Sequence, residues 1–381
     1  MPAMLKYALR YAPLLILALL LVPLRLYMAV RSQQQATSPA YQATSPFSPG
    51  SALYSVTLLP SGDAWAVGGS FSFFKSGAPG TTQGFPVPDN GIILHYTTHA
   101  WVAGKVADPL RLPLLGVSLD SPQDGWAVGW GGTFVHYDGN EWTTAAGPAN
   151  FNKNLLGVAM LTPADGWAVG YSGSILHYNG RQWTQVKSPT TLDLRSIAMP
   201  SAQEIWAVGS SGTILHYHNG TWSLVTPSPT NITLNGVAML STSEGWAVGE
   251  HGTILHYRDG TWESVHPANY YQNPAVYQSD AFFSVAMNSI RSGWIAGEEH
   301  VLTYSAEAWV EPDNSISFSV NGKYMKTTLT NLSLYSIVLS PSGEGWAVGR
   351  IDSIKSSAFT SERAAIFHFQ GGKWFTSLVL D

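Results

Sequence analysis

The chain has 381 residues, a formal net charge of −5 and only 11% charged residues. Its Lys and Arg residues occur singly rather than in runs, which argues against nucleic acid as a partner. Cysteine is absent, and this excludes disulfide bonds, thiolate metal ligands and cysteine nucleophiles.

A leucine-rich, apolar segment lies close to the N-terminus. Residues 11–24 carry no charge, and apolar character resumes after Arg25 and continues to Val30. The twenty residues from 11 to 30 are enough to span a bilayer as a helix if Arg25 extends to the interface. No site of small residues suited to signal cleavage follows closely. We therefore predict a signal anchor over residues 1–30 that tethers an extracytoplasmic protein to a membrane. A cleaved signal peptide, which would give a secreted protein, is the alternative.

Residues 31–50 form a polar linker rich in Pro, Ser and Gln. The sequence Gln-Ala-Thr-Ser-Pro occurs twice in it, at 35–39 and at 42–46. Such a segment has little apolar surface to bury, so we expect a tether without a core. The folded part of the chain is then predicted to span residues 51–381.

One motif dominates the rest of the chain. The tetrapeptide Trp-Ala-Val-Gly, with one drifted copy that reads Trp-Ile-Ala-Gly, begins at Trp65, Trp126, Trp167, Trp206, Trp246, Trp294 and Trp346. Where no insertion intervenes, successive copies lie about 40 residues apart, a period typical of propeller blades. A single unit of this size cannot bury both its faces, so we predict one repeat domain.

Each unit contains four short runs with the alternation of β-strands. In the unit around Trp167 these runs are 156–160, 167–170, 175–178 and a last one that begins at Trp183. Asn-Gly or Asp-Gly pairs separate the third and fourth runs, as in tight hairpins. We predict an all-β fold: a seven-bladed β-propeller of four-stranded antiparallel blades, preceded by one N-terminal hydrophobic helix.

Alternation within the unit predicts how the blades stack. Leu156, Val158 and Met160 share one side of the first strand, and Trp167 and Val169 share one side of the second. We expect each blade to have one bulky and one thin face, with the bulky face of one blade against the thin face of the next. Units stacked in this way are predicted to close into a ring.

The repeat carries insertions at 70–90, 267–280, 311–330 and 351–363. Because the loops of an up-and-down blade alternate between the two ends of the ring, all of these insertions are predicted on one face, over blades 5, 6, 7 and 1. Variable loops on a rigid scaffold are common recognition surfaces, so we predict that a protein partner binds this face. The insertion at 311–330 contains Asn321-Gly322 between two strand-like runs, which predicts an extra hairpin.

The candidate binding residues lie in these insertions and in neighbouring turns. They are Phe73, Phe74, Phe85, Tyr270, Tyr271, Tyr277, Lys323, Tyr324, Arg350 and Lys355, and in the sixth unit Glu298, Glu299 and His300. Aromatic and arginine side chains are enriched in protein interfaces. Two alternatives stay open: the aromatic residues pack their own loops down, and the Glu-Glu-His cluster is a solvated turn.

A histidine recurs in the third strand, at His95, His136, His177, His216, His256 and His368. Equivalent positions on stacked sheets lie at least about 10 Å apart, whereas ligands approach a metal ion to about 2 Å. We therefore expect no metal site, and we predict that each histidine makes a hydrogen bond between blades. Asp165, Glu204 and Glu244, which precede the tryptophans, are predicted to be turn residues.

The sequence shows no catalytic constellation. A sialidase-like mechanism needs a tyrosine nucleophile paired with a glutamate and several arginines on the substrate carboxylate, but the arginines here are few and scattered. We predict a non-enzymatic protein without a cofactor, whose propeller is monomeric. A carbohydrate-binding or sialidase-like propeller with a glycan as its ligand is the alternative.

The segments 245–249 and 252–262 read Gly-Trp-Ala-Val-Gly, then Gly-Thr-Ile-Leu-His-Tyr and Asp-Gly-Thr-Trp. They resemble the BNR/Asp-box-like repeats of bacterial propellers, and within these the chain is most similar to the photosystem II stability and assembly factor type. The resemblance covers residues 53–380 and implies an extracytoplasmic assembly or binding role with a protein partner. Propellers of the WD type fit less well, because no Trp-Asp pair occurs.

Overall fold

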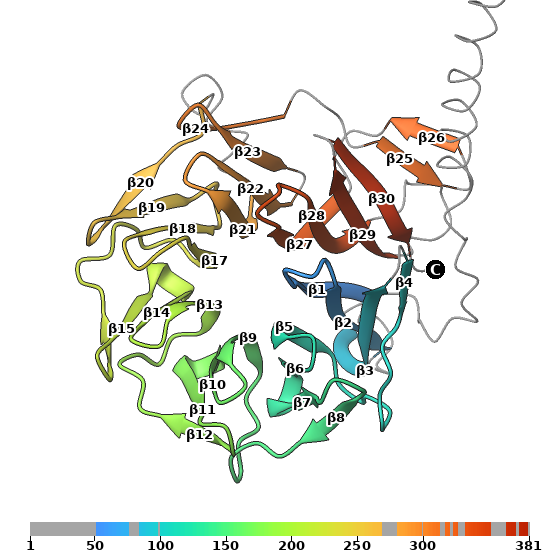
Figure 1. Cartoon of the computed structure of the whole chain (residues 1–381). Coiled ribbons are helices and arrows are strands. Elements are labelled where there is room, and N and C mark those ends of the chain that lie inside the picture. The colour runs from blue at the N-terminus through green and yellow to red at the C-terminus, as the bar shows by residue number, and fades with distance from the viewer. Residues whose placement is uncertain are drawn as a thin grey trace, which may run out of the picture. The chain divides into compact units, whose positions relative to one another are not determined.

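The computed structural model of the chain describes residues 51–75, 84–97, 100–268, 280–298, 300–312, 317–320, 323–326, 332–351, 363–370 and 373–379. These residues form seven sheets, which follow one another around a central axis (Figure 1). Six of the sheets have four strands and one has six. The predicted seven-bladed propeller of four-stranded antiparallel blades is thereby confirmed.

The predicted N-terminal helix, its anchor role and the linker fall on residues 1–50, outside the described residues. Within the described part of the chain, no helix is long and apolar enough to cross a bilayer. Helical geometry occurs in this part only as short 3-10 turns, at η1 (Trp130–Gly132), η2 (Tyr171–Gly173) and η3 (Ser210–Gly212). The anchor therefore stays a prediction.

Each blade runs outward from an inner first strand to an outer fourth strand. The first three blades are β1 (Ser51–Leu58), β2 (Ala64–Lys75), β3 (Gly84–Thr97) and β4 (Ala100–Ala103); β5 (Leu114–Ser121), β6 (Asp124–Gly129), β7 (Phe134–Tyr137) and β8 (Trp142–Ala145); and β9 (Leu155–Thr162), β10 (Asp165–Gly170), β11 (Ser174–Tyr178) and β12 (Trp183–Val186). Blades 4 and 5 are β13 (Leu194–Ser201), β14 (Glu204–Gly209), β15 (Ile214–His218) and β16 (Thr221–Leu224); and β17 (Leu234–Met239), β18 (Glu244–Gly249), β19 (Ile254–Arg258) and β20 (Thr261–Val265). Blades 6 and 7 are β21 (Phe282–Ser289), β22 (Ser292–Gly297), β23 (Val301–Ser305) and β24 (Ala308–Val310); and β27 (Leu332–Leu339), β28 (Gly345–Ile351), β29 (Arg363–Gln370) and β30 (Lys373–Val379), to which β25 (Ser317–Val320) and β26 (Lys323–Lys326) are added.

The prediction of one bulky and one thin face for each blade is wrong. In blade 3, Ala159 lies opposite Trp167, and Val158 lies opposite Ala168. Residues directly opposite each other in an antiparallel pair share a side of the sheet, so the large residues of β9 share a side with the small residues of β10. Each face of a blade therefore carries both large and small side chains. These side chains pack with those of the neighbouring blade in one hydrophobic cluster.

A tryptophan from each second strand fills the seam to the next blade. Trp167 is 4% exposed, and its ring lies edge-on to that of Trp222 in blade 4 with the centroids 5.5 Å apart. The ring of Tyr217, also from blade 4, lies 5.0 Å away. The same trio recurs at the other seams, where Phe369 replaces the tyrosine between blades 6 and 7. Such edge-to-face pairs add to the stabilisation that burial alone provides.

The ring closes through the same contact. Trp346 of blade 7 lies edge-on to Trp101 of blade 1, with ring centroids 5.1 Å apart, and Tyr96 lies 4.5 Å from it. Each described blade is built from strands that follow one another in the chain. Among the described residues, packing of side chains therefore joins the last blade to the first.

Serine side chains of the inner strands add hydrogen bonds across the seams. The Ser336 hydroxyl in blade 7 accepts a bond from the backbone N–H of Val56 in blade 1 at 3.2 Å, and Ser196 accepts one from Val237 at 3.2 Å. Ser55 and Ser284 accept equivalent bonds, and Ser118, two residues farther along its strand, accepts one from Met160. These bonds satisfy backbone donors at the inner edge of the sheets, which pairing within a blade leaves open.

The recurring histidines make their hydrogen bonds within a blade, so the prediction of bonds between blades is wrong. Nε2 of His177 lies 2.8 Å from Oδ1 of Asp165, and the ring of His177 stacks on that of Trp167 at 4.4 Å. All three residues belong to blade 3. Asp165 also begins β10 rather than only forming a turn, because its backbone pairs with Thr162 of β9. Blades 2, 4 and 5 repeat the pair of carboxylate and histidine.

The Asn-Gly and Asp-Gly hairpins between the third and fourth strands are confirmed in two forms. In blades 4 and 5 both central residues have positive φ, 47° and 90° for Asn219-Gly220 and 46° and 95° for Asp259-Gly260, as in a two-residue turn. In blade 3 only Gly180 has positive φ, and the Asn179 side chain instead accepts the backbone N–H of Gln182 at 3.1 Å. The two-residue form leaves one more residue on the third strand, namely His218 or Arg258.

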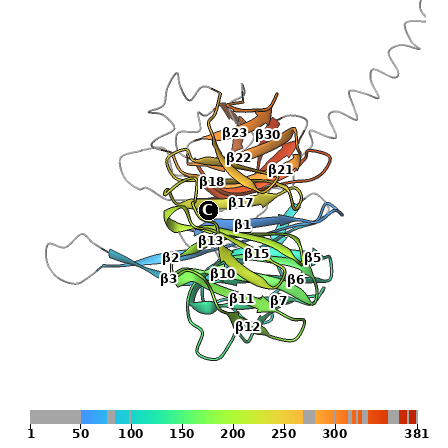
Figure 2. The ribbon, with the colours of Figure 1, turned by 90° about the vertical axis from the view of Figure 1, so that its left-hand side faces the viewer.

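One of the predicted insertions takes a different form from that expected. The described residues of the segment 70–90, namely 70–75 and 84–90, extend the β2–β3 hairpin instead of forming a loop, with pairing that continues to Lys75 and Gly84, and this hairpin leaves the ring on one side (Figure 2). The extra hairpin at 311–330 is confirmed as β25 and β26. It joins the outer edge of blade 7, where Ser317 pairs in parallel with Phe375, because the fourth strand of a blade has a free edge.

Replacement of the closure tryptophan, Trp346→Ala, should destabilise the propeller by about 3–5 kcal/mol, the usual cost of removing a buried Trp or Phe side chain. Urea unfolding followed by circular dichroism measures the free energy of unfolding. Leu224→Ala is the control, since Leu224 is 42% exposed. An equal loss in both variants would show that the closure seam is not held by this side chain.

Burial lowers the pKa of His95 and of His368 below the usual 6.5, and the nearby carboxylates of Asp63 and Glu344 offset this only in part. As the pH falls through 6.5, these histidines become protonated in the unfolded chain before they do so in the folded protein. Their contribution to the free energy of unfolding should therefore be fully present above pH 6.5 and decrease as the pH drops below it. Thermal unfolding at pH 7.5 and 5.5 should show a smaller difference in Tm for His368→Gln than for the wild type, whereas an unchanged difference would contradict this assignment.

Candidate functional site

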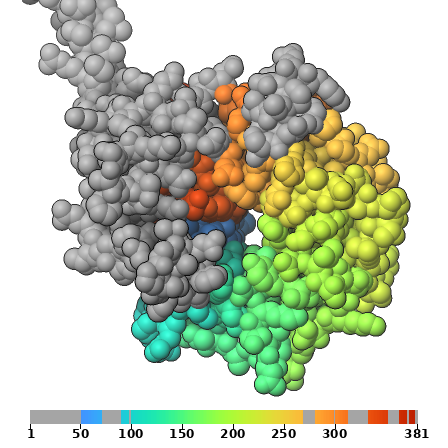
Figure 3. Space-filling model, turned by 180° about the vertical axis from the view of Figure 1, so that it is seen from behind, coloured from blue at the N-terminus to red at the C-terminus, as the bar shows by residue number. Residues whose placement is uncertain are grey.

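Every inner strand contains a β-bulge at the same place. The register between first and second strands skips one residue there, and the skipped residues are Tyr54, Leu115, Leu156, Arg195, Asn235, Phe283 and Tyr335. All of these are partly exposed. We call them the mouth ring, because the seven inner strands surround the axis (Figure 1) and the space-filling view shows the ring hollowed at its centre (Figure 3).

An arc of the mouth ring is aromatic. The rings of Phe283 in blade 6 and Tyr335 in blade 7 lie 5.2 Å apart, and those of Tyr335 and Tyr54 in blade 1 lie 5.6 Å apart. Contacts between residues of three consecutive blades require side chains that point toward the shared axis rather than into the seams. The equivalent bulge positions of blades 2 and 3 are also apolar, since they are Leu115 and Leu156.

The rest of the mouth ring is polar. Nη1 of Arg195 donates to Oδ1 of Asn235 at 3.0 Å, and Nδ2 of Asn235 donates to the backbone carbonyl of Phe282 at 2.9 Å. Arg195 also lies 3.7 Å from Oε1 of Glu250, and both side chains are about two-fifths exposed, at 39% and 40%. The guanidinium is therefore oriented by two neighbours while it still faces solvent, so it can bind a further acceptor.

The turns between second and third strands surround the mouth ring on the same face. Tyr171 opens one such turn and is 41% exposed. The next residue, Ser172, has a φ of 54°, and its backbone N–H donates to Oδ1 of Asp193 at 2.7 Å. Glu250 opens the equivalent turn of blade 5 and contacts Arg195 of the mouth ring. Turn and ring residues therefore form one continuous surface.

Most of the candidate residues from the sequence lie where their side chains are not described. Phe73, Phe74 and Phe85 lie on the extended β2–β3 hairpin, and Lys323 and Tyr324 begin β26. The positions Tyr270, Tyr271, Tyr277, Lys355 and Glu299 lie outside the described residues. The binding roles of these residues remain predictions.

Three of the candidates have described side chains. Nδ1 of His300 lies 2.8 Å from Oδ2 of Asp280, and its Nε2 lies 3.8 Å from Glu311. Glu298 is exposed and its backbone forms a bridge to Ser333 of blade 7, and Ser333 in turn pairs with Arg350. Glu298 and Arg350 therefore lie at the seam between blades 6 and 7, whereas His300 contacts residues that flank blade 6.

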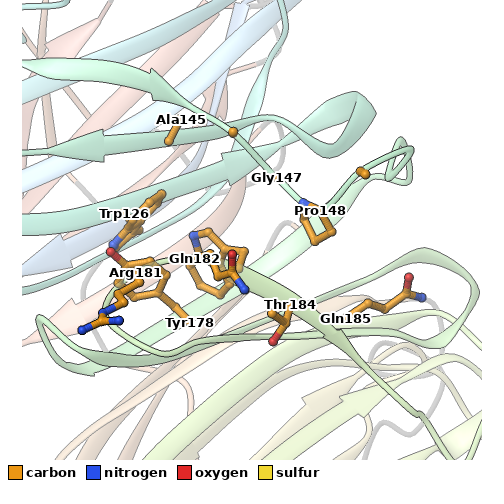
Figure 4. A pocket seen from close by; sticks show the side chains of 12 residues that line it. Trp126, Ala145, Gly147, Pro148, Tyr178, Arg181, Gln182, Thr184 and Gln185 are labelled. Carbon is orange, nitrogen blue, oxygen red and sulfur yellow. The ribbon is translucent and has the colours of Figure 1, made fainter.

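The seams also form clefts at the outer rim. One of about 540 Å³ lies between blades 2 and 3, and its lining includes Trp126, Tyr178, Arg181 and Gln182 (Figure 4). Another of about 470 Å³ lies between blades 5 and 6 and includes the equivalent Trp246. Because these clefts repeat the seam tryptophan and tyrosine, we attribute them to the blade architecture and favour the mouth ring as the candidate site.

The sequence predictions missed the mouth ring. Its signal is present in the sequence as the residue that follows the buried Leu or Phe of each first strand, which reads Tyr, Leu, Leu, Arg, Asn, Phe and Tyr in successive copies. Strict alternation assigns this residue to one face of the sheet. The bulge turns it toward the axis instead, because an extra residue on one strand has no partner across the ladder.

No family model and no curated protein matches the chain. Among solved structures, YCF48 bound to a D1 peptide is similar with a TM-score of 0.55 and 16% identity, over 79% of this chain and 91% of that one. YCF48 from Cyanidioschyzon merolae is similar with a TM-score of 0.53 and 14% identity, over 80% of this chain and 94% of that one. The WD40 propeller domain of Doa1 is similar with a TM-score of 0.56 and 11% identity, over 85% of this chain and 95% of that one. At these identities the comparisons show a shared propeller fold, and membership of the BNR repeat family stays a prediction.

Proposed function

We propose that this propeller is a non-enzymatic scaffold that binds a segment of a protein partner at the mouth ring. The observation that carries the proposal is the mouth ring itself: each blade contributes one partly exposed side chain at the same bulge, and these side chains differ from copy to copy. The residues at the inner-strand bulges and in the turns between second and third strands vary from blade to blade, whereas the residues of the seams repeat. Variation on a rigid framework is the usual arrangement of a binding surface.

The chemistry of the mouth ring favours a peptide with two kinds of group. Aromatic or aliphatic side chains would pack on the arc of Phe283, Tyr335 and Tyr54, where flat rings offer a large contact area. A carboxylate or backbone carbonyl would accept hydrogen bonds from Arg195. Support comes from the similar propeller that was solved with a D1 peptide bound.

The proposal also includes a location for the scaffold, which rests on the predicted anchor and linker. An anchor over residues 1–30 and a polar tether over 31–50 would hold the propeller at the outer surface of a membrane, where its partner would be an extracytoplasmic or membrane protein. The resemblance to photosystem II stability and assembly factors supports an assembly role. A reporter fused to the C-terminus that is active only after export should be active, and an inactive reporter would contradict the extracytoplasmic location.

Peptides selected from a display library on the full chain provide a defined ligand for the main test. Tyr335→Ser and Arg195→Ser should each weaken binding of a selected peptide by at least about tenfold, as expected for central aromatic and arginine anchors. Ile290→Ser is the matched control, because Ile290 is 64% exposed in the β21–β22 turn on the opposite face. Fluorescence anisotropy with a labelled peptide measures the affinity.

Equal affinity in wild type, Tyr335→Ser and Arg195→Ser, with unchanged thermal unfolding, would contradict a peptide site at the mouth ring. The carbohydrate alternative is separated by a glycan array probed with the same proteins. The carbohydrate alternative would be favoured if the display selection yields no peptide and the wild type binds a glycan that Tyr335→Ser does not bind.

A further inference from the structure

A glutamate and two histidines of blade 4 converge at the end of the ring opposite the mouth ring. Glu204 begins β14, and His216 and His218 lie two residues apart on β15. Glu204 pairs directly with His218, and Trp206 pairs with His216. Since opposite residues and residues two apart share a side of a sheet, the register places all three side chains on one side.

The side chains meet at the glutamate. Nε2 of His216 lies 2.5 Å from Oε2 of Glu204, and Nδ1 of His218 contacts the other carboxylate oxygen, Oε1. One atom from each residue lies within 4.8 Å of the other two. The ring of His216 stacks on Trp206 with centroids 3.9 Å apart, so its orientation is fixed by the seam.

The other blades show that the fold does not require this cluster. Blade 5 has the same glutamate and histidine as Glu244 and His256, but Arg258 takes the place of His218 and lies 3.6 Å from the carboxylate. In blade 7 the same position is Gln370, which donates to Glu344 at 3.0 Å. In blades 2 and 3 the third strand ends one residue earlier. An arginine or an amide therefore satisfies the same carboxylate, and the second histidine is particular to blade 4.

We propose that Glu204, His216 and His218 bind a divalent transition-metal ion of the zinc class. Two imidazoles and a carboxylate are a common protein ligand set for zinc, with a fourth position open to solvent. The two carboxylate oxygens of Glu204 each already meet one imidazole nitrogen, so the three side chains are brought together by the fold before any ion binds.

Access and orientation also suit an ion. The side chain of His218 is 56% exposed, whereas those of Glu204 and His216 are 17% and 23% exposed, so the ion would enter past His218. Nδ2 of Asn219 lies 2.7 Å from Nε2 of His218, so the amide donates to this ring nitrogen and helps to orient the ring. An ion on Nδ1 would move the ring hydrogen to Nε2, and a half-turn of the Asn219 amide would then present its oxygen as the acceptor, the kind of outer contact that orients a ligating histidine.

Blade 5 differs from blade 4 at one residue of the cluster, Arg258 in place of His218, and it therefore supplies a matched test. The full chain, solubilised in a mild detergent and purified without a polyhistidine tag, is titrated with Zn²⁺ by calorimetry and with Co²⁺ by visible absorption. Wild type should bind one ion per chain at this site. His218→Arg, which copies blade 5, should weaken binding by at least about tenfold, as the loss even of an outer contact can.

The reverse exchange, Arg258→His, should create a second site of the same kind in blade 5 and double the stoichiometry. Zn²⁺ should raise the Tm of wild type and not that of His218→Arg, because only a folded-state site stabilises by mass action. Thermal unfolding without metal verifies that both variants fold. Equal Zn²⁺ binding by wild type and His218→Arg, or no added site in Arg258→His, would overturn the proposal.

Discussion

The structure depends on one contact, the insertion of the second-strand tryptophan between the third and fourth strands of the following blade. Trp167, for example, meets Tyr217 and Trp222, and Trp346 meets Tyr96 and Trp101 where the ring closes. A four-stranded sheet has two faces to cover and cannot do so alone. The tryptophan covers one face of its own blade and one of the next, so each blade is stable only within the ring.

This constraint separates positions that must repeat from positions that are free to differ. The seam residues, the histidine stacked on the tryptophan and the hairpin glycines recur because their neighbours recur. The mouth ring and the turns that begin at residues such as Tyr171 and Glu250 contact solvent, so substitutions there cost little stability. We infer that function lies where the copies diverge, and this principle leads to both proposed sites.

The third strand illustrates how a small local change produces new chemistry. The two-residue turns at Asn219-Gly220 and Asp259-Gly260 lengthen β15 and β19 by one residue beyond the tyrosine. That residue lies beside a carboxylate already held by the stacked histidine. Its identity then decides whether the carboxylate is bound by a guanidinium, as in Arg258, or shared with a second imidazole, as in His218.

The sequence by itself determined the number of blades, their strands and the seam residues, because a motif repeated at a fixed period and strict alternation are both visible without coordinates. It also located the extra hairpin from Asn321-Gly322. The tertiary structure decided the partners: that Asp165 binds His177 within its own blade, that Ala159 shares a side with Trp167, and that Arg195, Phe283 and Tyr335 turn toward the axis. These facts depend on strand register and on the bulge. A shift of one residue in the register reverses the side to which a side chain points, and the pattern of residue types does not reveal such a shift.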